Sequence, residues 1–592
     1  MPKPSKTIRA LLVFLLSAAL PLAACGAPAP TPTSVPIAAP SATPTSGPPA
    51  PSITSVELDR AELPRYESLE MTVALQAQYT NPYDAREVSL DGIFTGPDGT
   101  QMTVPGFWDG KDSWRVRFTP SAEGEWRYQL TVKDTGGSSA PSEGTFNVTA
   151  SDLHGWLQVG KTVDPAYSAR YLAHHDGMPF YGVGHADAIT LFSGGFDAQQ
   201  GFSIFNQMQK AGENYVVWWP LYGNSPVNPT YNEYSIPNMG VLDLIVRDAE
   251  KKGIFLVFTI WDHAQLRDST HAWGPGQWEA NGFSKLTSIK DFFVSDESWV
   301  WQENFYRYVI ARWGYSRAIG MWQTVSEING TNAYDQTNSW HEKVNAYFIA
   351  NDPYRHPTTA SKSGDVEWSE GHAAMDAPQV HLYDFKLGTQ KIDAVHSAAV
   401  IARWTQLMWD VAEKPNWIGE FGADGSTYYP EMFHNSIWAA LASGAAMTPA
   451  EWNDGRSWGE MTKEMDADIA RLAAFVADIP LVKLDPASLA ISASDEQVRG
   501  WGVAGVEGGV LWVQDFALEG KTIDEVRADK TIRSGVQLEV RGLAAGTYLV
   551  TPYDTWQGQY LESFEITCTD GQTCPVALPD FHADLAFKLE RK

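Results

Sequence analysis

The sequence predicts a multidomain protein, in which a central (β/α)8 TIM barrel lies between an N-terminal Ig-like β-sandwich and a C-terminal β-sandwich. The chain has 592 residues, more than one hydrophobic core usually supports, and its 44% hydrophobic content is typical of a folded protein. Residues 53–150 and 484–592 contain short alternating runs separated by turn residues. Residues 151–483 instead alternate apolar runs with helical patterns, which indicates βα units.

Residues 1–24 have the pattern of an export signal. Lys3, Lys6 and Arg9 precede the short apolar run ALLVFLLSAAL. The segment closes on LAAC, which resembles the lipobox of bacterial lipoproteins and implies cleavage before Cys25 and diacylation of its sulfur. The alternative is an ordinary signal peptide followed by an incidental cysteine.

Residues 25–52 are predicted to be a tether, because a segment made almost only of Pro, Ala, Thr and Ser cannot bury a core. We therefore expect an exported body, lipid-anchored to the bacterial cell envelope and facing outward. The net charge of −28 argues against binding to nucleic acid or anionic lipid. The membrane would be contacted through the anchor alone.

Eight apolar runs within residues 151–483 are predicted to be strands. They are PFYGVGH (179–185), NYVVWWP (214–220), GIFLVFTIWDH (253–263), AIGMWQTVSEI (318–328), HPTTAS (356–361), PQVHLYDF (378–385), NWIGEFG (416–422) and AAMTPAEWN (445–453). Helical patterns such as MGVLDLIVRDAEKKG and SWVWQENFYRYVIARWG separate them. A closed barrel is the economical arrangement of such units.

Two of these runs place a carboxylate at a strand end, where barrel enzymes build their active sites. The fourth run carries Glu327 and the seventh carries Glu420. Two carboxylates across one barrel mouth are the catalytic groups that glycoside hydrolysis uses. One protonates the leaving oxygen and the other attacks the anomeric carbon.

The motifs around these residues resemble those of clan A glycoside hydrolases. WQTVSEI is similar to the strand-four acid/base motif and KPNWIGEFG to the strand-seven nucleophile motif. The resemblance implies that Glu327 is the acid/base, with a raised pKa beside a charged nucleophile, and that Glu420 is that nucleophile. HLY, with His381 and Tyr383, matches family-five members, in which the Tyr hydroxyl hydrogen-bonds the nucleophile.

Both flanking regions resemble modules of bacterial glycoside hydrolases. The stretch from GPDGTQMTVPGFW to EGEWRYQLTV is similar to β-sandwiches that precede such barrels, and GTYLVTPYDTWQGQYL looks like part of the β-sandwich that often closes them. Cys568 and Cys574 flank the turn-like TDGQT, so we expect a disulfide across a hairpin in an oxidising compartment. Two free thiols are the alternative.

Several other residues are candidates for substrate contact. Trp452 stands where the clan often places a Trp beneath the reacting sugar, whereas Ser326 replaces the usual Asn that holds the 2-hydroxyl. Val217 similarly stands where an Arg near the nucleophile is usual. The remaining candidates either contact substrate or bond neighbouring loops: His185, Asp187, Trp219 and Asp262.

No cofactor and no metal are predicted, since no H-E-x-x-H motif or cysteine cluster accompanies His263 and His271. The sequence therefore predicts a retaining β-glycoside hydrolase acting on an extracellular poly- or oligosaccharide. The alternative is a surface-anchored carbohydrate-binding lipoprotein whose barrel is catalytically impaired, which the substitutions Ser326 and Val217 leave open.

Overall fold

The computed structural model describes residues 49–592, apart from 112, 188–197, 222–226, 270–273, 334–335, 365–367, 390–391, 423–428 and 453–460. The predicted signal segment, Cys25 and nearly all of the predicted tether lie outside the described residues. Residues 48–592 form one compact unit. Within the described part of the chain, no helix has both the length and the apolar character needed to cross a bilayer.

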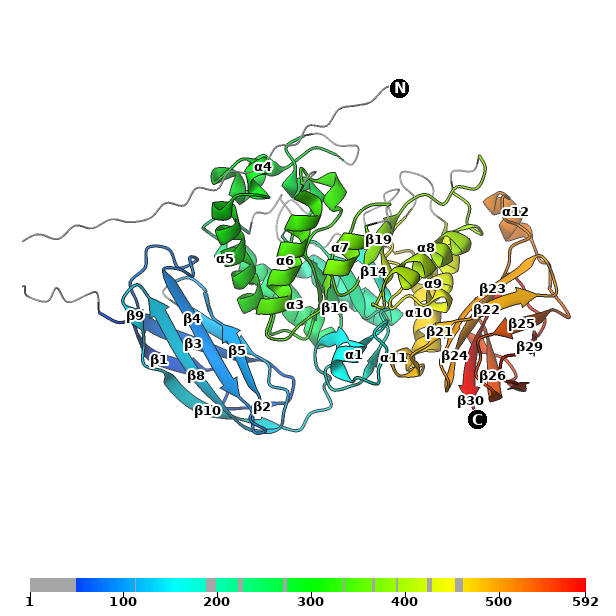
Figure 1. Ribbon diagram of the computed structural model, residues 1–592, viewed down its shortest axis with the longest axis horizontal. Coiled ribbons are helices and arrows are strands. Elements are labelled where there is room, and N and C mark those ends of the chain that lie inside the picture. The colour runs from blue at the N-terminus through cyan, green and yellow to red at the C-terminus, as the bar shows by residue number, and fades with distance from the viewer. Residues whose placement is uncertain are drawn as a thin grey trace, which may run out of the picture. The chain divides into compact units, whose positions relative to one another are not determined.

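The N-terminal strands form two sheets (Figure 1). One contains, in order, β1 (Ser52–Leu58), β3 (Leu69–Gln76), β7 (Trp114–Phe118) and β6 (Phe107–Trp108). The other contains β2 (Glu62–Pro64), β10 (Ser142–Thr149), β8 (Gly124–Asp134), β4 (Val88–Thr95) and β5 (Gln101–Pro105), with β9 (Gly137–Ser138) beside β8. Alternate residues of β8 are buried, as expected for a strand with one face on a core.

A parallel region follows a small antiparallel sheet of β11 (Leu157–Val159), β12 (Leu172–His174) and β13 (Pro179–Phe180). Five parallel strands are β14 (Gly184–Asp187), β15 (Tyr215–Trp218), β16 (Phe255–Thr259), β17 (Ile319–Gln323) and β18 (Thr358–Thr359). A separate parallel pair is β19 (Gln379–Leu382) and β20 (Trp417–Phe421). Isolated parallel bridges extend these sheets, joining Ser363 to His381, Phe421 to Glu451 and Gly182 to Met447.

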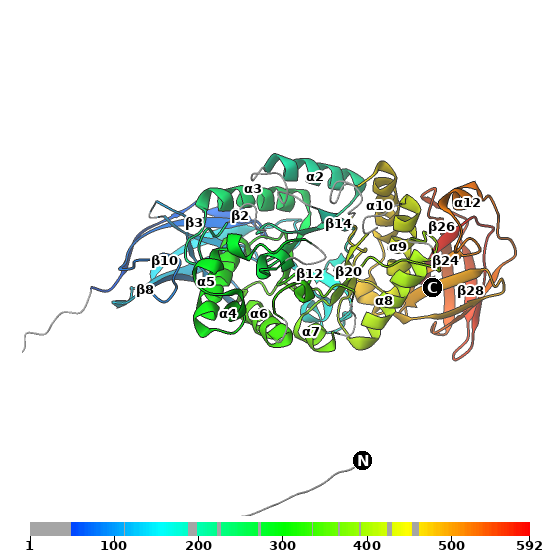
Figure 2. The same cartoon turned by 90° about the horizontal axis from the view of Figure 1, so that it is seen from above.

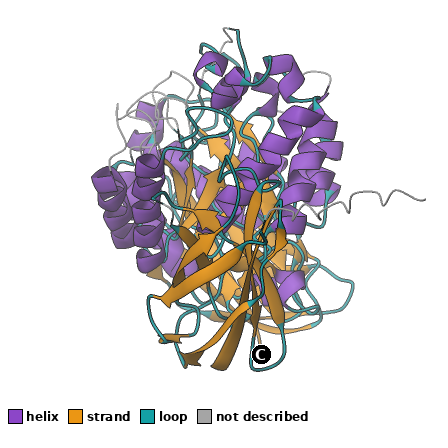
Figure 3. Cartoon of the chain, turned by 90° about the vertical axis from the view of Figure 1, so that its left-hand side faces the viewer, coloured by secondary structure: helices purple, strands orange, loops and turns teal. Residues whose placement is uncertain are grey.

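Helices alternate with these strands along the chain, and Figure 3 shows helices to either side of the strands of the molecule. The α-helices are α1 (Gly160–Val163), α2 (Ala198–Ala211), α3 (Ile236–Lys252), α4 (Ile289–Phe292), α5 (Asp296–Trp313), α6 (Thr337–Asn351), α7 (Ser369–Ala374), α8 (Ser397–Val411), α9 (Pro430–Ser443), α10 (Lys463–Val476) and α11 (Leu481–Leu484). Figure 2 shows α2 beside α3. Short 3-10 turns are η1 (His263–Leu266), η2 (Trp278–Ala280), η3 (Gly282–Lys285) and η4 (Ile328–Gly330).

Two of the predicted strands need correction. The first predicted run splits, because Pro179–Phe180 pairs antiparallel with β12 and the parallel strand starts only at Gly184. The eighth run forms no continuous strand among the described residues but two single bridges, at Met447 and Glu451. Pro449 lies between them and has no N–H to donate, but the N–H groups of Ala450 and Trp452 still donate to the carbonyls of Ile418 and Phe421 at 2.9 and 2.7 Å, so the segment keeps hydrogen bonds to β20.

The C-terminal strands also form two antiparallel sheets. The larger contains β21 (Ala487–Ser488), β23 (Val498–Ala504), β24 (Gly508–Asp515), β30 (Asp584–Arg591), β26 (Gly546–Asp554) and β27 (Gln559–Tyr560), with β28 (Phe564–Cys568) on β26. The smaller contains β22 (Ala490–Ala493), β25 (Gln537–Arg541) and β29 (Cys574–Ala577); the short helix α12 (Ile523–Ala528) precedes β25. Cys568 and Cys574 form a disulfide, with Cα atoms 5.0 Å apart.

A buried ion cluster joins the N-terminal sheets to the helices of the parallel region. Both carboxylate oxygens of Asp243, on α3, accept hydrogen bonds of 2.8–3.2 Å from Arg117 of β7 and from Arg312 of α5. The Trp313 indole donates to the same carboxylate at 2.8 Å. The two arginines lower the pKa of Asp243 to about 2, although burial alone would raise it. One carboxylate is therefore shared by two buried cations. Glu70 and Asp109 supply each of them with a second carboxylate partner, Glu70 to Arg117 at 2.8 Å and Asp109 to Arg312 at 3.0 Å.

A second buried cluster joins α9 and α10 to the C-terminal sheets. The His434 ring contacts Asp468 through Nδ1 at 2.9 Å and Asp584 through Nε2 at 3.2 Å, and it stacks on Trp556. Burial alone would lower the pKa of His434, but the charges of Asp584 and Asp468 outweigh burial and raise it to about 9. His434 is therefore a cation at neutral pH.

Replacing Asp243 by Asn should lower the free energy of unfolding by about 3–5 kcal/mol, because Arg117 and Arg312 would stay buried without their shared carboxylate. Urea denaturation followed by tryptophan fluorescence measures the change. Glu67→Gln, which breaks the exposed pair with Arg60, is the control and should change the same free energy by less than about 0.5 kcal/mol. Equal effects of the two substitutions would contradict the account.

Stability should also depend on pH through His434. Its pKa is raised from 6.5 to about 9, so its ion pairs contribute fully below pH 6.5 and their contribution is lost as pH rises through about 9. The melting temperature of the wild type should therefore fall over this window relative to that of His434→Gln. Parallel melting-temperature profiles of the two proteins between pH 6.5 and 9 would rule the effect out.

Candidate active site

Glu327 lies in a strained backbone conformation just after β17. Its φ of 54° and ψ of 59° are left-handed, which costs a non-glycine residue on the order of 1 kcal/mol or more. The Glu327 N–H donates to Ser361 Oγ at 2.8 Å, and the next N–H, of Ile328, donates to the Ser361 carbonyl at 3.0 Å. The end of the fifth predicted strand thus holds the turn that presents the Glu327 carboxylate.

Glu420 lies within β20, and its neighbours come from β19. The parallel register pairs His381 with Glu420, so both side chains come from the same level of the sheet. The Tyr383 hydroxyl donates a hydrogen bond to Glu420 Oε1. Gly422 is required here, because a Cβ at that position would lie 2.0 Å from the Trp452 carbonyl oxygen.

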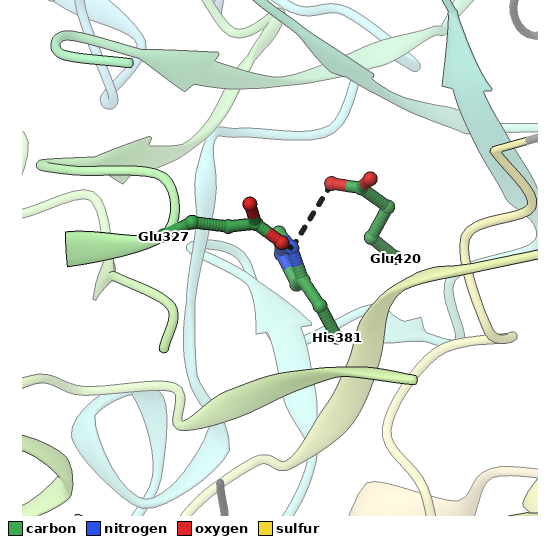
Figure 4. A group of neighbouring side chains, drawn as sticks. All are labelled: Glu327, His381 and Glu420. Carbon is green, nitrogen blue, oxygen red and sulfur yellow. Dashed lines mark hydrogen bonds and ion pairs between the residues drawn. The ribbon is translucent and has the colours of Figure 1, made fainter. Parts of the chain in front are cut away.

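One imidazole nitrogen joins the two carboxylates (Figure 4). His381 Nδ1 lies 2.9 Å from Glu327 Oε1 and 3.0 Å from Glu420 Oε2. Burial alone would lower the pKa of His381, but the charges of Glu420 and Glu327 raise it to about 10. The site therefore contains an imidazolium between two carboxylates.

The pKa expected for Glu327 needs correction. The sequence predicted a raised value, and burial of the carboxyl does act in that direction. The hydrogen bond and the charge of His381 outweigh burial, with a further contribution from His263, so the pKa of Glu327 is lowered. Without a ligand, Glu327 is held as the carboxylate.

These three side chains could also share a metal ion. Among the described residues, one ligand atom each from Glu327, His381 and Glu420 lies within 4.8 Å of the others. One imidazole and two carboxylates suit a divalent transition metal, but His381 would first have to lose its Nδ1 proton. The absence of a catalytic metal stays a prediction.

The remaining polar candidates lie at neighbouring strand ends. Asp262 and Ser326 form a parallel bridge next to Glu327, and the Asp262 carboxylate accepts from the Ala264 N–H at 2.8 Å as the cap of η1. His185 is buried between Glu213, with 2.5 Å from Nδ1 to Oε2, and Asp187, with 3.5 Å from Nε2 to Oδ2. Asp262 and His185 thus have hydrogen-bond or ion-pair partners within the protein. Bonding of this kind was the alternative to substrate contact for both residues.

Trp219 and Trp452 pack against each other, with ring centroids 4.9 Å apart and planes inclined by 51°. Both are buried in the absence of a ligand. Val217 is buried in β15, where it offers no donor to Glu420. The donors that the described residues do supply to that carboxylate are Tyr383 and His381.

Sequence reasoning did not assign roles to Ser361, Ser363 and Arg267. Ser361 and Ser363 hydrogen-bond Glu327, and Arg267 contacts His263, whose Nε2 lies 3.7 Å from Glu327 Oε2. Ser361 closes a predicted strand, so the same strand-end argument would have found it. Arg267 follows a turn, and no pattern in the sequence indicates where its side chain lies.

A cavity of about 1110 Å³ lies elsewhere and is not lined by Glu327, His381 or Glu420. It lies between N-terminal strands and the residues around β13 and α3. Part of its charged lining is paired, for example Arg247 with Glu70 at 3.1 Å and Arg317 with Glu250 at 3.7 Å. The arrangement does not bring reactive groups together as the carboxylate pair does.

Comparison with known proteins supports the fold. Residues 62–133 match a family described as a domain of unknown function, DUF5060. A "putative glycoside hydrolase" from Bacteroides vulgatus ATCC 8482 is 17% identical, with a TM-score of 0.63 over 90% of this chain and 100% of that one. This likeness shows a common fold and, at such low identity, no more than the fold.

Two further solved structures agree less well. A glycoside hydrolase family 5 protein from the same Bacteroides strain is 13% identical, with a TM-score of 0.47 over 73% of this chain and 95% of that one. The endo-1,4-beta-mannanase of Rhizomucor miehei is 16% identical, with a TM-score of 0.41 over 52% of this chain and 98% of that one. No curated protein matches the sequence.

Proposed function

We propose that this protein is a retaining β-glycoside hydrolase that acts on an extracellular poly- or oligosaccharide by double displacement. One observation carries the proposal: Glu327 and Glu420 meet at His381 Nδ1, with an oxygen of each carboxylate within 4.8 Å of the other. Carboxyl groups about 5–5.5 Å apart leave no room for an attacking water, so one of them attacks the sugar itself.

The parallel region is proposed to close into a (β/α)8 barrel. Support comes from the three parallel bridges, which connect the fifth strand with the sixth, the seventh with the eighth, and the eighth with the segment before β14. Closure would bring the carboxyl ends of β17 and β20 to one mouth, where barrel enzymes carry their chemistry. The contacts of Glu327 and Glu420 with one imidazole agree with that arrangement.

In the proposed reaction Glu420 attacks the anomeric carbon while Glu327 protonates the leaving oxygen. Tyr383 donates to Glu420 Oε1 and leaves the other oxygen beside His381. A bound sugar that excludes water would strengthen the effect of burial, which already acts to raise the pKa of Glu327. Substrate binding thus favours the protonated acid.

His381 favours the second half of the reaction. When Glu420 becomes a glycosyl ester, it loses its negative charge, and the imidazolium then interacts with Glu327 alone. The hydrogen bond from Nδ1 stabilises Glu327 as the carboxylate, the form that takes a proton from the attacking water. One residue therefore supports the change of Glu327 from acid to base.

The domain layout and location belong to the same proposal. An Ig-like module at 53–150, a catalytic barrel at 151–483 and a closing β-sandwich at 484–592 would stand on a tether from the lipidated Cys25. The sheets of the N- and C-terminal regions support the two β modules. The outward-facing envelope location rests on the sequence of residues 1–52.

A carbohydrate-binding lipoprotein with an impaired barrel is the competing proposal. Two observations favour it: Val217 is buried in β15 where a donor to the nucleophile is usual, and the pKa of Glu327 is lowered in the free site. A panel of aryl β-glycosides and β-linked glycans separates the two. Sugar release by the wild type supports the enzyme, and binding without release supports the alternative.

The two Glu variants should behave differently. Glu420→Ala should lose hydrolysis by several orders of magnitude, because it removes the nucleophile, and azide should yield a glycosyl azide of inverted configuration. Glu327→Ala should still cleave aryl glycosides with good leaving groups but lose natural glycosides, because only the latter require protonation. Glu67→Gln, which is remote and exposed, should retain wild-type rates. An inverted first product from the wild type would overturn the mechanism.

Lipidation at Cys25 is separately testable. The mature wild type should begin at Cys25 and partition with membranes, whereas Cys25→Ala should appear in the soluble fraction with unchanged activity. Cell fractionation and mass spectrometry of the N-terminus measure both. A wild type recovered wholly in the medium would contradict the anchor without affecting the proposed chemistry.

A further inference from the structure

The side chain of Asn329 binds the main chain of Ser363. Asn329 Oδ1 accepts a hydrogen bond from the Ser363 N–H at 3.0 Å, and Asn329 Nδ2 donates to the Ser363 carbonyl at 3.3 Å. Because the N–H can only donate and the carbonyl can only accept, the main chain fixes the orientation of the amide. One side chain thus pairs with both main-chain groups of Ser363, as a neighbouring strand would.

The amide takes the place of a strand that turns away. At Ser361 the partner is still the main chain, since the Ile328 N–H donates to the Ser361 carbonyl at 3.0 Å. The chain then leaves the ladder, because Glu327 has a left-handed conformation and η4 follows it. Two residues further along, the Asn329 side chain supplies the partners that the Ser363 N–H and carbonyl require.

The other edge of the Ser363 segment pairs with His381. Ser363 and His381 form a parallel bridge, and the Gly364 N–H donates to the His381 carbonyl at 2.9 Å. Hydrogen bonds therefore connect the turn after Glu327, through Ser363, to β19. The two ends of this connection carry the side chains that meet in the site, with 2.9 Å between His381 Nδ1 and Glu327 Oε1.

We propose that Asn329 is a positioning residue, which joins the turn that presents Glu327 to the segment beside His381 and so maintains the contact between these two residues. Glu327 needs such support, because a left-handed conformation is unfavourable for a glutamate and persists only where neighbouring contacts hold it. The catalytic role of Glu327 rests on the proposed function, whereas the hydrogen bonds of Asn329 do not.

Amide hydrogen exchange tests the contact without measuring activity. In the full wild-type chain the Ser363 amide should be protected, and Asn329→Ala should speed its exchange about 10-fold, the effect of losing one hydrogen bond. The Gly364 amide, whose partner is on β19, should change much less. Asn329→Asp should keep the protection, because a carboxylate oxygen still accepts from the Ser363 N–H. A Ser363 amide that exchanges equally fast in the wild type and in Asn329→Ala overturns the proposal.

Kinetics tests the effect on Glu327. Asn329→Ala should lower kcat/KM for glycosides with poor leaving groups about 10- to 100-fold, because a displaced acid protonates them less well, with a much smaller loss for activated aryl glycosides. Asn329→Asp, which loses the donor to the Ser363 carbonyl, should show a loss in the same direction. The control is Asn351→Ala, because this exposed asparagine also donates to a main-chain carbonyl, that of Tyr347 at 2.8 Å, and it should retain wild-type rates.

Equal losses on both substrate types would show that Asn329 does not position Glu327. The Asn329 side chain is exposed, so Asn329→Ala is expected to fold. If that variant does not fold, the kinetic comparison of the wild type with Asn329→Asp, which has the same size, decides the proposal. A wild type that is inactive on every substrate would overturn the proposed function, and the exchange measurement would still decide the hydrogen bonds of Asn329.

Discussion

The contact of His381 with both Glu327 and Glu420 is the interaction on which the candidate site depends. Two buried carboxylates within 4.8 Å of each other would repel, and one would take up a proton, unless a cation lay between them. The imidazolium of His381 supplies that cation from β19, between the ends of β17 and β20. It therefore lies between the two carboxylates and lowers the pKa of Glu327.

Buried cations also hold the larger parts of the molecule together. The chain carries 71 acidic and 43 basic residues, so a cation placed inside finds carboxylate partners readily. Arg117 and Arg312 converge on Asp243 where N-terminal strands meet α3 and α5, and His434 joins α9 and α10 to β30. Removing one partner of such a cluster strongly destabilises the folded protein, because the remaining charge stays buried without its partner. The clusters therefore favour a single arrangement of the elements that meet at these junctions.

The pKa of Glu327 is subject to two opposed effects. Burial raises it, whereas the hydrogen bond and the charge of His381 lower it and win in the free site. A proposed acid/base has to both hold and release a proton, so a carboxyl under opposed effects of this kind suits the proposed reaction.

The sequence by itself determined the local features: alternating runs that became strands of the β sheets, apolar runs that contain β15 to β20, and two glutamates at strand ends. Periodicity and strand-end position are local properties, so they can be predicted from residue order. The sequence could not determine the lowered pKa of Glu327, the partners of Arg267 and His185, or the reduction of the eighth predicted strand to isolated bridges. Only the tertiary structure decided these, because pKa values and ion pairs depend on charges brought within a few ångströms by residues far apart in the chain.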